Sequence, residues 1–259
     1  PRPEGLGAIP FVATDLASAE LIKYGANAFL ALKISFINEL AALAERMGAD
    51  IREVARGIGL DARIGLRFLQ AGLGWGGSCF PKDTLALLAM GREYGLRLPI
   101  VEAAWEVNAR QRERVVEKLL GELKTLKGKT IALLGLSFKP HTDDLRDSPA
   151  LALARLLLER GAFVRAHDPV ALPRARREVG RSLEYAETPE AVLAGADAVV
   201  LATDWPEYRT WPWRELRPLL RHALVVDARN HLDGEALARA GYRYLGVGIP
   251  DLFPVQEVV

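Results

Sequence analysis

The sequence contains few of the residues that several common kinds of site require. One cysteine in 259 residues excludes an intramolecular disulfide and indicates a reducing, cytoplasmic setting. All four histidines lie after residue 140, outside any motif that would pair one with the cysteine, so the pattern argues against a Cys–His protease. We also expect no metal site.

Net charge and hydropathy exclude further classes of protein. Lys and Arg number 34 against 33 Asp and Glu, so a net charge of +1 gives no overall attraction to nucleic acid or membrane. Nearly apolar runs such as 196–202 are far shorter than the roughly 20 residues that span a bilayer, and no segment resembles a signal peptide. Because 50% of the residues are hydrophobic, we expect a soluble chain with two buried cores.

Residues 1–124 are expected to form an all-helical domain. A proline-free run over about 16–47 predicts one long helix, capped by Thr14 or Asp15 and ended by Gly48. Apolar residues surround much of its axis, which favours a homodimer formed through this helix. Shorter helices are predicted at 51–58, 81–94 and 99–123, and the opening residues 1–5 are expected to be irregular.

Residues 125–259 alternate strand-like and helix-like segments, which predicts a Rossmann-like, doubly wound parallel α/β domain. The fold class is therefore α/β with a helical domain in front. The expected strands are 130–134, 162–166, 198–202, 223–226 and 242–245, and the expected helices are 149–160, 189–194, 213–219 and 234–240.

Cys79 is the strongest candidate for a catalytic residue. It follows four glycines in the segment 72–77 and precedes a helix that opens with Pro81, so free amides and the helix dipole can stabilise a thiolate. The glycines would also let a substrate approach the sulfur. Asp83 could cap this helix or reach the substrate. The alternative is that a lone cysteine is a small buried apolar residue.

Lys23 and Asn27 form a second candidate pair. Their spacing of four residues puts both side chains on one face of the long helix, where they could bind a developing oxyanion. Taken alone, such a pair is more often solvated or structural.

Several of these segments resemble the nucleotide-sugar 6-dehydrogenases, in the form typical of UDP-glucose 6-dehydrogenase. The resemblance covers nearly the whole chain after about residue 12. It is carried by residues 18–30 and 33–39, by Phe68-Leu69-Gln70-Ala71-Gly72 and Gly76-Gly77-Ser78-Cys79-Phe80-Pro81-Lys82-Asp83, and by residues 135–139, 142–149 and 226–230.

The resemblance implies an activity. Enzymes of this family oxidise the sugar C6 alcohol twice with two NAD, through a thiohemiacetal and a thioester on the cysteine. By resemblance, Cys79 is the nucleophile, Lys23 and Asn27 stabilise the oxyanion, and Asp83 positions the lysine or a water. Residues implied to bind the substrate are Arg63 (across a dimer interface), Phe68, Leu69, Gly72, Trp75, Gly76, Phe138, Lys139 and Arg229, and those implied to contact NAD are Lys82 and Arg146.

Strand positions give independent support for three of these residues. Phe138 and Lys139 follow the first predicted strand and Arg229 follows the fourth, and ligands of open α/β sheets bind beyond the carboxyl ends of strands. Cations suit a diphosphate. A solvated surface lysine remains the alternative for Lys139.

The family's NAD domain carries Gly-x-Gly-x-x-Gly directly after its first strand, and none of the strands expected in this chain is followed by that pattern. The second domain reads Gly135-Leu136-Ser137-Phe138-Lys139-Pro140 at the corresponding turn, so we do not expect NAD to bind there. The chain thus corresponds to the central and C-terminal domains, and we expect it to bind UDP-glucose without turning it over. The alternatives are a non-catalytic nucleotide-sugar binding or dimerisation module, and a dehydrogenase for GDP-mannose or a UDP-N-acetyl-amino sugar.

Overall fold

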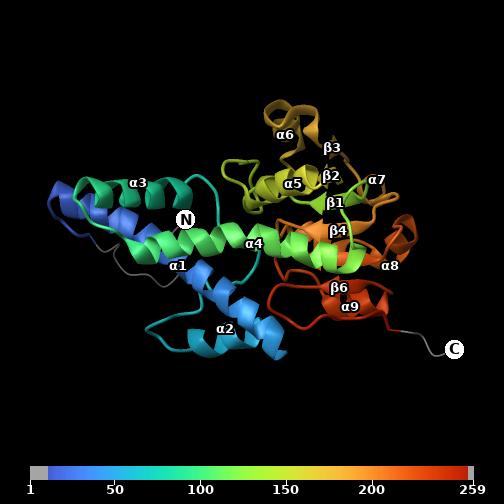
Figure 1. The fold of residues 1–259 in the computed structure, drawn as a ribbon, viewed down its shortest axis with the longest axis horizontal. Coiled ribbons are helices and arrows are strands. Elements are labelled where there is room, and N and C mark those ends of the chain that lie inside the picture. Colours follow the sequence, from blue (N-terminus) through green and yellow to red (C-terminus); the bar gives the residue numbers. More distant parts are fainter. Residues whose placement is uncertain (1–10, 256–259) are drawn as a thin grey trace.

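The computed structural model describes residues 11–255 and shows a helical part joined to an α/β part (Figure 1). The opening segment that was expected to be irregular lies outside the described residues. The helices of the first part are α1 (Leu16–Met47), α2 (Ile51–Gly59), α3 (Phe80–Glu93) and α4 (Pro99–Leu123). All four were predicted, with bounds that differ by no more than one residue.

Capping interactions account for the bounds of α1. The side chain of Asp15 accepts a hydrogen bond from the amide of Ser18, which satisfies one of the free donors at the helix start. Gly48 ends the helix with φ at 71°, a conformation that glycine adopts without steric cost. The helix is thus delimited by two residues that the sequence alone identifies.

α1 differs from expectation in its hydropathy. By length and composition it could cross a membrane, with a mean hydropathy of 1.3 over its most apolar window. Uninterrupted apolar runs do not reveal this property, because Lys23, Lys33 and Glu39 interrupt the helix. Such a property is weak support for a membrane span, since core helices pass the same test, and α1 packs against α2, α3 and α4.

The α/β part contains a six-stranded parallel sheet in the order β3-β2-β1-β4-β5-β6, which confirms the predicted doubly wound topology. The strand β3 was not predicted, because it has only two residues and neither is buried. The strands are β1 (Thr130–Leu134), β2 (Phe163–His167), β3 (Glu184–Tyr185), β4 (Ala198–Leu201), β5 (Leu224–Asp227) and β6 (Arg243–Leu245).

Helices cover both faces of this sheet (Figure 1). The helix α6, rich in arginine, was not predicted. The segment 213–219 was predicted as one helix, but it changes to a 3-10 turn at Arg217, where Pro218 supplies no amide for the α-helical ladder. The helices are α5 (Pro149–Glu159), α6 (Leu172–Glu178), α7 (Pro189–Leu193), α8 (Trp213–Leu216) and α9 (Gly234–Arg239).

The two parts share their cores. Val115 and Leu119 of α4 are buried in the same apolar cluster as Ile131 of β1, while Ile37 of α1 packs in the cluster of Val225 on the other face of the sheet. Burial of this apolar surface fixes α4 and α1 against the sheet. The segment between α2 and α3, which contains Cys79, is therefore held between two bodies that are themselves packed together.

Candidate functional site

Asp83 is the centre of a compact polar cluster at the start of α3. Its Oδ2 atom accepts hydrogen bonds from Nζ of Lys23 at 2.9 Å and from Nδ2 of Asn27 at 2.5 Å, and its Oδ1 atom accepts one from Nζ of Lys82 at 2.6 Å. The structure therefore brings together four residues predicted from two distant motifs, namely Lys23 and Asn27 from one and Lys82 and Asp83 from the other. Asp83 does not cap its helix; its carboxylate instead joins α3 to α1.

The electrostatics of this cluster favour negative charge nearby. The hydrogen bond from Lys82, followed by those from Lys23 and Asn27, outweighs the effect of burial and lowers the pKa of Asp83 to about 2. Asp83 is therefore ionised at neutral pH. The two lysines carry one positive charge more than the aspartate neutralises, and both ammonium groups remain largely exposed. A developing anion next to the cluster would be stabilised.

Cys79 occupies the N-cap position of α3, directly before this cluster. Its thiol is exposed, and its carbonyl oxygen accepts the amide of Asp83 at 2.9 Å. Lys82 and Arg146 both interact electrostatically with the thiol, and a thiolate would raise the pKa of each. The reading of Cys79 as a buried apolar residue is wrong, because the side chain faces solvent at a helix start with cations nearby.

The glycines before Cys79 are packed against protein. An added Cβ atom would come within 2.7 Å of Ala228 O at Gly72 and within 2.0 Å of Asp147 O at Gly76, and at Gly77 it would meet the Phe138 ring. The expectation that the glycines let a substrate approach the sulfur stays a prediction. They allow the loop to lie against the α/β part.

The helical part holds the same loop through polar side chains that sequence reasoning missed. Asn38 of α1 accepts the amide of Gly72 at 2.8 Å, and Asn108 of α4 bonds both backbone groups of Trp75. Asn38 and Asn108 lie on otherwise apolar helix faces, and this alone could have drawn attention to them. The loop provides partners for both polar atoms of the Asn108 amide and for the Asn38 oxygen, whereas Nδ2 of Asn38 is buried without a hydrogen-bond partner among the described residues.

The α/β part contributes Phe138, Lys139 and Arg229. Nζ of Lys139 lies 5.4 Å from the centre of the Phe138 ring, which itself packs on Gly77. Arg229 donates from Nε to Ala202 O at 2.8 Å and from NH1 to Gly74 O at 3.1 Å. All three strand-end residues thus lie beside the glycine loop, as expected from the edge at which the strands end.

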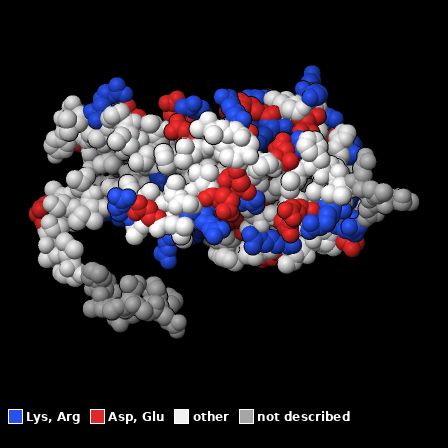
Figure 2. Space-filling model, turned by 90° about the horizontal axis from the view of Figure 1, so that it is seen from below, with Lys and Arg blue, Asp and Glu red and all other residues white. Residues whose placement is uncertain are grey.

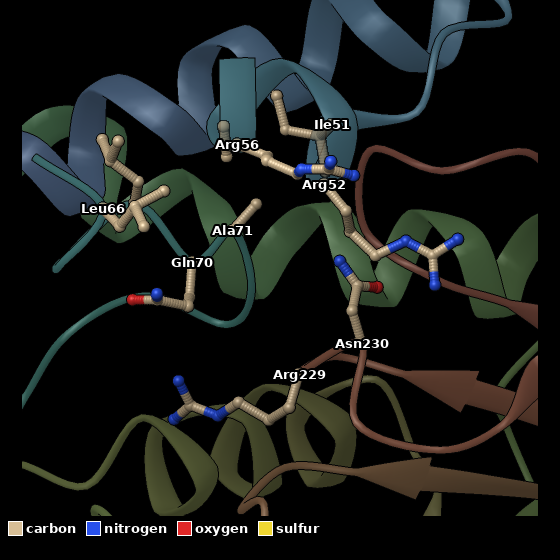
Figure 3. Close-up of a pocket in the computed structure, with 10 residues that line it drawn as sticks. Ile51, Arg52, Arg56, Leu66, Gln70, Ala71, Arg229 and Asn230 are labelled. Carbon is tan, nitrogen blue, oxygen red and sulfur yellow. The ribbon is translucent and has the colours of Figure 1, made fainter. Parts of the chain in front are cut away.

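Leu69 and Arg229, two predicted substrate residues, line one pocket of about 260 Å³ between α2 and the loop after β5 (Figure 3). Arg52 and Arg56 come from α2, and the amide side chains of Gln70 and Asn230 complete the polar lining. Burial lowers the pKa of Arg229 below its ordinary value, but a guanidinium stays charged at neutral pH. The lining suits an anionic ligand with a planar, polar base.

Other predicted residues have partners within the chain. Arg63 is exposed and pairs with Asp61, and Arg146 pairs with Asp144 through two nitrogens. Phe68 has φ at 65°, an uncommon conformation for a bulky residue, and its ring lies 6.1 Å from that of Phe80. The contacts of these three residues with a substrate or cofactor stay predictions.

Trp75 is buried in the helical part. Its indole nitrogen donates to Ser35 Oγ at 3.0 Å, and its ring packs edge-to-face on Trp105 with centroids 4.9 Å apart. The ring therefore holds the loop in place, and a direct contact with the substrate stays a prediction.

The Rossmann-like turn after β1 does not fit a dinucleotide. The amides of Leu136 and Ser137, which would face a pyrophosphate in a dinucleotide-binding fold, both donate to Oδ2 of buried Asp168, at 2.8 and 3.0 Å. At Gly135 an added Cβ atom would lie 2.3 Å from Thr203, so the turn is also closed on that side. These contacts satisfy the donors internally, in agreement with the expectation from the turn sequence.

Fold and site together define a two-part α/β protein in which an exposed cysteine stands where a helical part meets a Rossmann-like sheet. The central-domain model of the UDP-glucose/GDP-mannose dehydrogenase family matches residues 17–110, and the UDP-binding-domain model of that family matches residues 132–234. The chain belongs to this family.

Known relatives agree. The chain is 47% identical over 241 residues to UDP-glucose 6-dehydrogenase TuaD of Bacillus subtilis, covering 93% of this chain and 52% of that protein. It is 44% identical over 251 residues to a UDP-glucose 6-dehydrogenase of Rhizobium meliloti, covering 96% and 57%. The structure of a UDP-glucose dehydrogenase from Pyrobaculum islandicum superposes with a TM-score of 0.81 at 45% identity, covering 90% of this chain and 51% of that one. The chain thus spans about half the length of these relatives.

Proposed function

We propose that these residues form the nucleophile-bearing and nucleotide-sugar-binding part of an NAD-dependent UDP-glucose 6-dehydrogenase. The observation that carries the proposal is the Asp83 cluster, which joins Lys23 and Asn27 to the helix that begins at Cys79. Membership of the family and 47% identity to a UDP-glucose 6-dehydrogenase support the choice of substrate.

In this proposal the first oxidation removes a hydride and a proton from the C6 alcohol, and Cys79 then attacks the carbon of the resulting C6 aldehyde. A C–S bond forms, and the carbonyl electron pair moves onto oxygen. The thiol is exposed at a helix N-terminus and interacts electrostatically with Lys82 and Arg146, so the attacking sulfur is open to a substrate. NAD, when bound to the intact enzyme, would accept the hydrides removed from C6. Hydrolysis of the later thioester would return the thiol.

Lys23 and Asn27 are proposed to hold the resulting oxyanion. Each side chain uses one N–H group in a hydrogen bond to Asp83 Oδ2, which leaves two N–H groups free on the lysine and one on the asparagine amide. Asp83 would keep both donors aimed before the substrate arrives, so that little reorganisation is needed. A well-aimed donor of this kind is commonly worth about 3 kcal/mol of transition-state stabilisation.

The pocket lined by Leu69 and Arg229 is proposed to take the nucleotide end of the substrate. Arg229 supplies positive charge for a diphosphate, beside Arg52 and Arg56, which pair with Asp50 and Glu53. Gln70 can pair with the edge of a pyrimidine base, while the Asn230 amide bonds both backbone groups of Val247 and shapes the pocket wall. Lys139 would meet the phosphates from the end of β1.

Calorimetric titration of the chain with UDP-glucose, GDP-mannose and UDP-N-acetylglucosamine tests the substrate. We expect UDP-glucose to bind most tightly and to slow the modification of Cys79 by a disulfide reagent. Preference for another nucleotide sugar would reassign the substrate within the family. Binding without protection of Cys79 would favour a non-catalytic nucleotide-sugar module.

We further propose that the chain forms a homodimer through α1. Ile22, Phe29, Phe36 and Leu43 recur at every seventh position and are all exposed in the single chain, with exposed fractions of 48–61%. Figure 2 shows few charged residues over much of the helical part and many of both signs over the α/β part. A second copy would cover this apolar stripe.

A cytoplasmic location also stays a prediction.

A further inference from the structure

Asn108, a residue of α4, forms hydrogen bonds with both backbone groups of Trp75 in the loop that leads to Cys79. Oδ1 of Asn108 accepts the Trp75 amide proton at 2.8 Å, and Nδ2 of Asn108 donates to the Trp75 carbonyl oxygen at 3.0 Å. The asparagine is 2% exposed, so water does not replace either bond. Two bonds of opposite sense fix the direction of the chain at this point as well as its position.

The neighbouring residue shows how closely the loop approaches α4. Gly74 has φ at 99°, and a Cβ atom there would lie only 2.2 Å from Oδ1 of Asn108. Arg229 donates to Gly74 O, and Ser35 accepts the indole proton of Trp75. Side chains from α4, from α1 and from the loop after β5 therefore meet at two consecutive residues.

We propose that Asn108 is a positioning residue that sets where Cys79 lies relative to the α/β part, acting through Trp75. α4 continues from Asn108 into the sheet core, where Val115 and Leu119 are buried, so the position of the sheet is transmitted along a continuous helix. Gly76 and Gly77, which pack on the α/β part, lie between Trp75 and Cys79. The proposal rests on the proposed function in one respect, namely that Cys79 reacts with the sugar.

UDP binding and protection of Cys79 report on opposite ends of the substrate. A specific effect of Asn108 should change the second and leave the first, whereas a general loss of structure would change both. Leu69 and Arg229 line the pocket proposed for the nucleotide, whereas Asn108 acts on the part of the loop that leads to the sulfur. A change at Asn108 should therefore leave binding of UDP largely intact. It should weaken the effect of the sugar on Cys79, because a displacement of about 1 Å at a reacting group can cost up to about a hundredfold.

Two substitutions of Asn108 remove one or both of its hydrogen bonds to Trp75, and a third substitution, at Gln111, is the control. Asn108→Asp keeps an acceptor for the Trp75 amide and loses the donor to its carbonyl, while Asn108→Leu loses both. Gln111→Leu is the matched control, since Gln111 is also buried on α4 and, among residues 11–255, its side chain bonds only Val107 O of the same helix. Cys79 is the single cysteine, so a disulfide reagent such as 4,4′-dithiodipyridine reports on it alone.

We expect Asn108→Leu to bind UDP within about threefold of the wild type while protection of Cys79 by UDP-glucose weakens about tenfold or more. Protection of Cys79 in Asn108→Asp should lie between that in the wild type and that in Asn108→Leu. Protection in Gln111→Leu should match the wild type. Unchanged protection in folded Asn108→Leu, or an equal loss in Gln111→Leu, would overturn the proposal.

Hydrogen exchange of the wild-type chain provides a test that needs no variant. The Trp75 amide should exchange slowly, and exchange as fast as that of an open loop would also overturn the proposal. If Asn108→Leu does not fold, the proposal is tested by the protection of Cys79 in Asn108→Asp and by the exchange rate of the Trp75 amide in the wild type. If the wild type binds no nucleotide sugar, the proposed function fails, and the labelling rate of Cys79 in the variants together with the Trp75 amide still tests the role of Asn108.

Discussion

Nζ of Lys23 lies 2.9 Å from Oδ2 of Asp83, although 60 positions separate the two residues in the sequence. This ion pair joins α1 to the first turn of α3, beside the exposed thiol of Cys79. The carboxylate is 1% exposed, whereas the lysine side chain is 60% exposed and can still turn two of its protons toward a ligand. The pair therefore combines a fixed anchor with a donor that remains available.

Replacement of Asp83 by asparagine should make stability less dependent on acid pH. The folded pKa of about 2 lies below the ordinary value of 3.8, so the carboxylate contributes stability above about pH 4 and loses it as the pH falls toward about 2. The shift corresponds to about 2 kcal/mol, which screening of the exposed lysines reduces to about 1 kcal/mol. Urea unfolding at about pH 6 and about pH 3 measures this.

The difference between wild type and Asp83→Asn should be present at the higher pH and shrink at the lower one. Asp143→Asn, at an exposed aspartate whose nearest cation lies 3.7 Å away, is the control. A difference that stays constant with pH would contradict the assignment.

Gly76→Ala should disturb the catalytic loop, because its Cβ atom would lie 2.0 Å from the carbonyl oxygen of Asp147 and 2.7 Å from Pro149. We expect a loss of about 2 kcal/mol or more in the free energy of unfolding, together with loss of UDP-glucose protection at Cys79. Gly121→Ala is the matched control. Gly121 lies within α4 with no atom near its added Cβ, so this change should stabilise the chain by up to about 1 kcal/mol. Equal effects of the two substitutions would rule out close packing at Gly76 as the cause.

Glu45→Gln should weaken the junction between the helical and α/β parts. Glu45 pairs with Arg114 at 2.7 Å and Lys118 at 2.9 Å and accepts the amide of Gly248 at 2.8 Å. Burial raises the pKa of Glu45, but the bonds from Gly248 and Lys118 lower it further, so the residue is charged. Without that charge the half-buried Arg114 and Lys118 lack their anionic partner, and we expect a loss of about 2 kcal/mol in the free energy of unfolding.

Denaturant unfolding measures this loss, and Glu39→Gln on the exposed face of α1 is the control. An effect of Glu45→Gln no larger than that of Glu39→Gln would show that the cluster adds nothing to stability.

Phe36→Glu should convert the proposed dimer to a monomer. Phe36 is 48% exposed at the middle of the apolar stripe on α1, and a dimer would bury its new charge without a partner. Sedimentation velocity at micromolar concentration distinguishes the two masses. Phe163→Glu, at a 65% exposed phenylalanine of β2, should leave the mass unchanged. A wild-type chain that sediments as a monomer would remove the basis for this prediction.

Local sequence signals were sufficient for most of the fold. Asp15 and Gly48 delimit α1, and alternating apolar runs predicted every strand except β3, which is too short to give such a signal. The same reasoning missed α6, whose arginine-rich sequence has few apolar positions. The predicted domain boundary near residue 124 stays a prediction, since α4 contributes to both parts.

For the candidate site, too, one part was predictable from the sequence and another part only from the tertiary structure. By itself the sequence determined the candidate catalytic residues: Cys79 was identified by its glycine loop and helix start, and Lys23, Asn27 and Asp83 by spacing and resemblance. Only the tertiary structure decided that those three side chains meet, and that Asn38 and Asn108 hold the loop. The physical reason is that helix caps and periodicity arise from interactions within a few residues. A buried amide or carboxylate finds its partner only when distant segments pack together.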